Sequence, residues 1–154
     1  MVLRQVQASP DRTLVSEREH AMSTPAYDRT PQAYTLEFTL PGLPRMSNSL
    51  LRGHWRAKHG HAMTWKRAVW RACWQLAPKE PLERAKLTLV RCSSVEPDFD
   101  GLVSSMKHVI DGLVEARIIS NDKSANIGVP EYKWERAKPA KGCVKVKVEE
   151  LCEP

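Results

Sequence analysis

Long apolar runs are missing from this sequence, because no stretch approaches the ~20 residues that a membrane-spanning helix needs. Paired cysteines are missing too. The four cysteines of the chain are isolated and show no C-x-x-C spacing. No signal peptide is evident either. We therefore expect a cytoplasmic protein with reduced thiols, no membrane partner and no nucleotide cofactor. The cysteines are Cys73, Cys92, Cys143 and Cys152.

Acidic residues are absent from one long segment, residues 38–79. The chain has a net charge of +6, and the concentration of basic residues in this segment favours a polyanionic partner such as DNA. The alternative is a helix with a solvated basic face and tryptophans in the core. Three histidines, His54, His59 and His61, do not predict zinc, because no cysteine pair or H-E-x-x-H motif accompanies them. We expect DNA contacts from Arg52, Arg56, Lys58, Lys66, Arg67 and Arg71.

The chain length predicts one domain, residues 34–154, and weak apolar periodicity predicts a flexible tail at residues 1–33. The order of the expected elements is β, α, β, α, β, β, which predicts an α+β fold with a small mixed sheet packed against helices. The C-terminal strand is expected to be antiparallel. Strands are expected at 34–40, 85–91, near 130 and at 143–151, and helices at about 62–76 and 101–116.

Two aspartates, Asp98 and Asp100, stand directly before the second predicted helix. We expect Asp100 to be the N-cap, because its carboxylate can accept from the free N–H groups of the first turn. Asp98, in an extended segment, would project to the same side. Two adjacent carboxylates repel unless a positive charge lies between them, and such oxygen ligands suit Mg²⁺ or Mn²⁺.

Lys107 and Asp122 complete the candidate site. At 100° per residue, the apolar residues of the helix cover one arc, and Lys107 lies on the opposite side with Ser104, Asp111 and the direction of Asp100. Each residue alone also has an ordinary explanation. Asp-x-Asp can be a cap with a solvated acid, Lys107 a surface lysine paired with Asp111, and Asp122 a turn residue.

These residues carry a family resemblance. The segment D-F-D-G-L at 98–102, a lysine and an aspartate four residues apart, and D-G-L-V-x-A-x-I-I-x-N-D at 111–122 resemble the RusA-type Holliday-junction resolvases. These are small bacterial and phage endonucleases. The resemblance covers roughly residues 34–150 and implies a homodimer in which Asp98, Asp100 and Asp122 bind Mg²⁺ and Lys107 is needed for activity. The helix holds extra residues between Asp100 and Lys107 compared with the founding sequence of the family.

The resulting expectation is a Mg²⁺-dependent endonuclease of DNA recombination and repair that cleaves four-way DNA junctions by phosphodiester hydrolysis. Two alternatives stay open. One is a junction-binding module without catalysis, and the other is a flap or fork nuclease with the same acidic site. The origin of Asp122 is also open. A helix over 101–116 spans about 24 Å, so either the following residues fold back along it or a second subunit supplies Asp122.

Overall fold

The computed structural model describes residues 33–46 and 52–152, which belong to one α+β domain. The predicted tail at residues 1–33 lies outside the described residues, apart from Ala33. A four-stranded mixed sheet forms the centre, with strand order β1-β4-β2-β3. The strands are β1 (Thr35–Pro41), β2 (Ala85–Ser93), β3 (Glu131–Arg136) and β4 (Cys143–Glu150).

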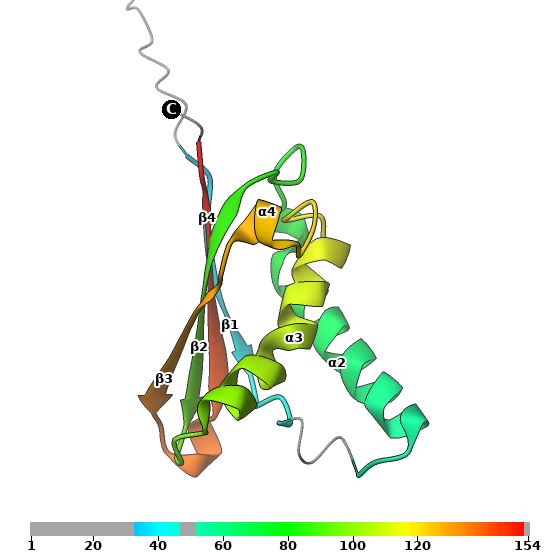
Figure 1. The fold of residues 1–154 in the computed structure, drawn as a ribbon, viewed down its shortest axis with the longest axis vertical. Helices are drawn as coiled ribbons and strands as arrows, with labels where there is room; N and C mark the ends of the chain where they lie inside the picture. The colour runs from blue at the N-terminus through cyan, green and yellow to red at the C-terminus, as the bar shows by residue number, and fades with distance from the viewer. Residues whose placement is uncertain (1–32, 47–51, 153–154) are drawn as a thin grey trace, which may run out of the picture. The chain divides into compact units, whose positions relative to one another are not determined.

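The pairing confirms the predicted mixed sheet. β4 is antiparallel to both β1 and β2, and β3 is parallel to β2. Alternation along the strands turns one face toward the helices, and the apolar side chains on that face are buried beneath them. Figure 1 shows the helices together on this side of the sheet. The buried sheet residues include Leu36, Leu40, Leu87, Leu89, Val144, Val146 and Val148.

Helix α2 (Trp55–Cys73) continues into a 3-10 turn, η1 (Trp74–Leu76). The prediction of a start near residue 62 was wrong, because His54 caps the helix: its Nδ1 accepts from the backbone N–H of Arg56 at 3.3 Å. Histidine is an uncommon cap, so no strong start signal precedes this helix. Leu76, the last residue of the predicted helix, is 53% exposed. The 3-10 turn changes the angle between successive side chains and turns Leu76 outward.

Helix α3 (Phe99–Glu115) begins earlier than predicted, and its N-cap is Asp98 rather than Asp100. The Oδ1 atom of Asp98 accepts from Gly101 N at 3.1 Å. Gly101 makes room for this carboxylate, since a Cβ there would lie 2.3 Å from the same Oδ1 atom. Asp100 instead occupies the first turn, where the helix dipole favours its negative charge.

Helices α2 and α3 approach closely at Gly112. A Cβ at this position would lie 2.8 Å from Val69 Cβ and 3.2 Å from the backbone Cα of Lys66. The neighbouring backbone cannot yield as a flexible side chain would. The close crossing of the two helices therefore depends on the missing side chain.

We expect Gly112→Ala to destabilise the domain by about 1–2 kcal/mol, because overpacking outweighs the better helix propensity of alanine. Thermal unfolding should show a melting temperature lower by about 5 °C. Gly60→Ala is the matched control, because Gly60 is also helical and a Cβ there meets nothing within 4 Å. It should stabilise the domain by about 0.5–1 kcal/mol. Equal effects of both changes would contradict this account of the crossing.

Candidate metal and DNA site

The two aspartates lie at the N-terminal end of α3, just after the chain leaves β2. Both side chains are exposed. The segment before residue 47 lies against the same end of the helix, because the Met46 sulfur would be only 2.8 Å from a Cβ at Gly101. Asp98 and Asp100 therefore form an accessible pair of carboxylates within one helical turn.

Asp122 is placed by a tight reversal after α3. Arg117 adopts a positive φ of 59°, its N–H donates to Val114 O, and Ile118 N donates to Leu113 O. This is the Schellman pattern, which ends a helix and turns the chain back. Ile118 is fully buried after the turn, and its carbonyl accepts from Leu82 N at 2.9 Å. The segment that follows brings Asp122 back beside α3.

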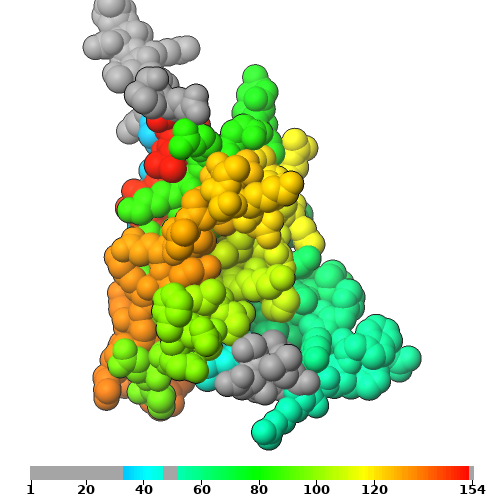
Figure 2. All heavy atoms as spheres, in the orientation of Figure 1, coloured from blue at the N-terminus to red at the C-terminus, as the bar shows by residue number. Residues whose placement is uncertain are grey.

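A groove of about 410 Å³ lies between α3, α4 (Ser124–Ile127) and the start of β3. We call it the Asp122 groove. The helix side chains Ser104, Lys107 and Asp111 line it together with Asp122, so the predicted polar side of α3 is confirmed. Figure 2 views the face where α3 lies between β3 and α2. The groove also contains apolar side chains from Val103, Ile110, Ile127, Pro130 and Tyr132.

Lys107 is the available cation of this groove. Its neighbour Asp111 has a carboxylate oxygen 3.5 Å from His108 Nδ1, and Lys66 donates to Glu115 at 2.8 Å. The hydrogen bond to Glu115 is also the main reason that the pKa of Lys66 is raised. No salt bridge to Lys107 occurs among residues 33–46 and 52–152. Its exposed ammonium can therefore meet a phosphate.

The structure brings Lys107 to Asp122 but does not bring Asp98 and Asp100 to them. Along the helix axis, Asp98 and Lys107 are separated by about 14 Å at ~1.5 Å per residue. In the part of the chain that the structure describes, no group of three or more His, Cys, Asp or Glu side chains is placed to hold a metal ion. The carboxylate pair fits a hard cation in its chemistry, but one chain supplies only two of the three expected ligands at that point.

The basic segment is largely exposed on α2 and just before it. Within it, Lys66 is engaged by Glu115. Trp65 is buried in the core, but Trp55, Trp70 and Trp74 are exposed, so the alternative with tryptophans in the core fits Trp65 alone. Of the other predicted DNA contacts, Arg52, Arg56, Arg67 and Arg71 are exposed and Lys58 is half-buried.

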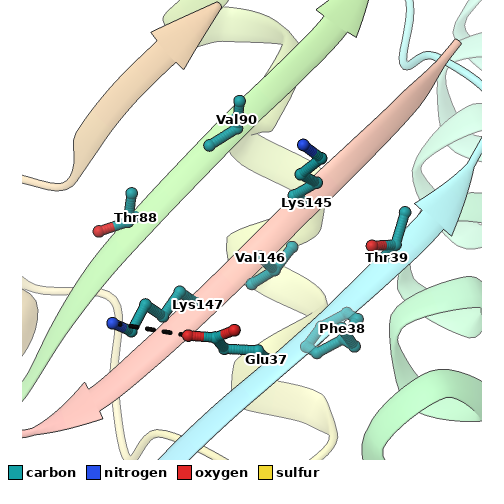
Figure 3. Close-up of a pocket in the computed structure, with 8 residues that line it drawn as sticks. All are labelled: Glu37, Phe38, Thr39, Thr88, Val90, Lys145, Val146 and Lys147. Atoms are coloured by element: carbon teal, nitrogen blue, oxygen red, sulfur yellow. Dashed lines mark ion pairs between the residues drawn. The ribbon is translucent and has the colours of Figure 1, made fainter. Parts of the chain in front are cut away.

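A second hollow, of about 320 Å³, lies on the sheet face opposite α2 and α3 (Figure 3). Its charged side chains are paired: Lys147 lies 3.5 Å from Glu37 and 3.0 Å from Glu149. Lys145 pairs with Glu135, and that hydrogen bond raises the pKa of Lys145. This face is a neutralised, solvated surface, so it is a poor candidate for a phosphate site.

One supporting residue was missed in the sequence. Arg91 is 7% exposed, and its Nη1 donates to Pro44 O at 2.8 Å, which fixes the loop beside the start of α3. Burial lowers its pKa. The sequence did contain a signal for this burial. Arg91 lies two residues after Leu89 and four after Leu87, so its side chain points to the same face of β2 as theirs.

None of the helices in residues 33–46 and 52–152 has the length and apolarity to cross a membrane. The four cysteines are all free thiols.

No protein-family model matches the chain, and a search of curated proteins gives no match.

Proposed function

We propose that this protein is a Mg²⁺-dependent, structure-selective endonuclease that cleaves four-way DNA junctions. The observation that carries the proposal is the arrangement along one side of α3. An exposed carboxylate pair stands at its start, and Lys107 and Asp122 meet in a groove farther along it. The resemblance to RusA-type resolvases supplies the junction as substrate. The acid-free helix α2 supports a polyanionic partner.

The separation of the acids favours a site made by two subunits. In a two-fold dimer with antiparallel α3 helices, Asp122 of one chain would lie beside Asp98 and Asp100 of the other. A two-fold axis would create two such sites, and two sites suit symmetrical cleavage of two strands. The third carboxylate missing at the start of each α3 would then come from the partner subunit.

Three groups of residues would have separate roles in metal binding, catalysis and DNA binding. Asp98, Asp100 and Asp122 would hold Mg²⁺, which when bound supplies an activated water and charge stabilisation at a phosphodiester. Lys107 would place its ammonium against the negative charge that grows on the phosphoryl oxygens in the transition state. Arg52, Arg56, Arg67 and Arg71 would hold the arms of the substrate through their phosphates.

The decisive experiment compares labelled four-way junction, linear duplex and fork, each with and without Mg²⁺. The proposal expects cleavage of the junction alone, and only with the metal. Binding without cleavage would instead favour the non-catalytic junction-binding module. Preferred cleavage of the fork would favour the flap or fork nuclease, which shares the acids but binds a different DNA shape.

The basic segment gives a separate prediction. Replacing Arg52, Arg56, Arg67 and Arg71 by Gln should weaken binding to junction and duplex alike. Each lost phosphate contact should reduce the slope of log affinity against log salt by ~0.9, so four should reduce it by about 3.6. A salt titration by fluorescence anisotropy measures this slope.

The matched control removes the same number of positive charges from the sheet face opposite α2 and α3. A variant with Gln at Lys86, Lys133, Lys145 and Lys147 loses four positive charges that are already paired with acids. Its salt slope should stay near the wild-type value. An unchanged slope in the arginine variant would mean that this segment is only a solvated face.

A further inference from the structure

Two tryptophans stack on the exposed side of α2. The rings of Trp70 and Trp74 are nearly parallel, with centroids 5.3 Å apart and an angle of 7° between the planes. The side chains are 47% and 48% exposed, so each indole keeps about half of its surface in water. They are four residues apart: Trp70 lies in the last turn of α2, and Trp74 is the first residue of the 3-10 turn η1 that continues it. The stacked pair is therefore an exposed aromatic surface.

Arginines flank this pair. Arg67 precedes Trp70 by three residues, and Arg71 precedes Trp74 by three. At ~100° per residue, Arg67, Trp70 and Arg71 fall within an arc of about 100° on α2, and Trp74, in the 3-10 turn η1 that follows, stacks on Trp70. Both arginines are exposed, and α2 contains no acidic residue. The surface therefore combines aromatic faces with positive charge.

The combination of aromatic rings and positive charge narrows the classes of partner that could bind this surface. A second copy of the same surface would bring Arg67 and Arg71 against like charges, with no acid on α2 to offset them. An anionic membrane would need a wider apolar face, but the apolar face of α2 is already buried, with Trp65, Val69 and Cys73 in the core. Unpaired nucleobases match both features, because each base has a π-face and each linking phosphate a negative charge.

We propose that Trp70 and Trp74 form a stacking platform for unpaired nucleobases, with Arg67 and Arg71 contacting the phosphates on either side. The inference rests on the DNA-binding part of the proposed function and deepens it. It adds a site for single-stranded or unstacked segments of a branched substrate. Double-stranded arms would not use the platform, because their bases are stacked on one another.

The test measures binding of a labelled oligothymidylate and of a blunt hairpin duplex by fluorescence anisotropy. The double variant Trp70→Ala, Trp74→Ala should bind the single strand about tenfold more weakly or worse, because base–aromatic stacking contributes strongly to such affinity. Duplex affinity should change by less than about twofold, because phosphate contacts to the arginines remain. The conservative variant Trp70→Phe, Trp74→Phe should recover most of the single-strand affinity, because phenyl rings still stack.

Several outcomes would overturn the platform. These are an unchanged single-strand affinity in the alanine variant, an equal loss for duplex, or no recovery with phenylalanine. Selective loss of binding to vesicles of phosphatidylserine and phosphatidylcholine would assign the surface to membranes instead. Circular dichroism and melting temperature check that each variant is folded. Junction cleavage by the wild type, assayed in parallel, separates the two proposals: cleavage with an unchanged single-strand affinity refutes the platform alone.

Discussion

Asp98→Asn and Asp100→Asn should each reduce Mg²⁺-dependent cleavage of a four-way junction by about a hundredfold or more. Each change keeps the shape of the side chain but removes a negative ligand. Stabilisation of transition-state charge by a bound metal is worth several kcal/mol, and each 1.36 kcal/mol is tenfold in rate. Asp122→Asn should have the same effect. Single-turnover cleavage of labelled junction measures the rates.

The choice of asparagine separates chemistry from folding. Asp98 caps α3 through its bond with Gly101 N, and asparagine caps a helix about as well as aspartate. The melting temperature of Asp98→Asn should therefore stay close to wild type. Junction binding should be retained or improved, because a negative charge that faces phosphates is lost.

Glu135→Gln is the matched control for these variants. It removes one exposed negative charge from the sheet face that the helices do not cover. Its cleavage rate should equal that of the wild type. A rate within a few-fold of wild type for Asp98→Asn or Asp100→Asn would remove these residues from the proposed site.

The strands and the apolar face of α3 were predictable because each depends on a local period. Alternation of two residues is visible in β1 and β4, and these strands lie within a residue of their predicted positions. The side of α3 that carries Lys107 and Asp111 follows from counting angles, and both residues line one groove. Such periodic patterns can be read directly from the sequence.

The errors arose where one segment depends on a neighbour in space. The cap of α3 moved to Asp98 because Gly101 leaves space for its carboxylate, which residue types alone do not show. The reversal after α3 uses Arg117 at positive φ, where glycine or asparagine would have been the recognisable signal. The exposed stacking of Trp70 on Trp74 was also hidden, because tryptophans at helical spacing are usually buried in a core.

The second large effect concerns whether Asp122 joins Asp98 and Asp100 from a second subunit. Mixing inactive Asp98→Asn with inactive Asp122→Asn, under conditions that exchange subunits, should restore nicking of the junction. In a shared site, each heterodimer has one site with both acids changed and one site with both wild-type acids. Random exchange makes about half of the dimers hetero, so nicking should recover to about a quarter of the wild-type number of sites.

The geometry motivates this expectation, since Asp122 lies in the groove with Lys107, about 14 Å along α3 from Asp98 at ~1.5 Å per residue. Ligands of one Mg²⁺ must each lie within about 2.1 Å of the ion, so a single chain in this conformation cannot join them. The control mixture combines Asp98→Asn with Asp100→Asn. These acids belong to the same half-site, so both sites of every dimer stay damaged and nicking should not return. If native mass spectrometry detects heterodimers of Asp98→Asn with Asp122→Asn and they remain inactive, the shared site is excluded, and a rearrangement within one chain must bring Asp122 to the pair.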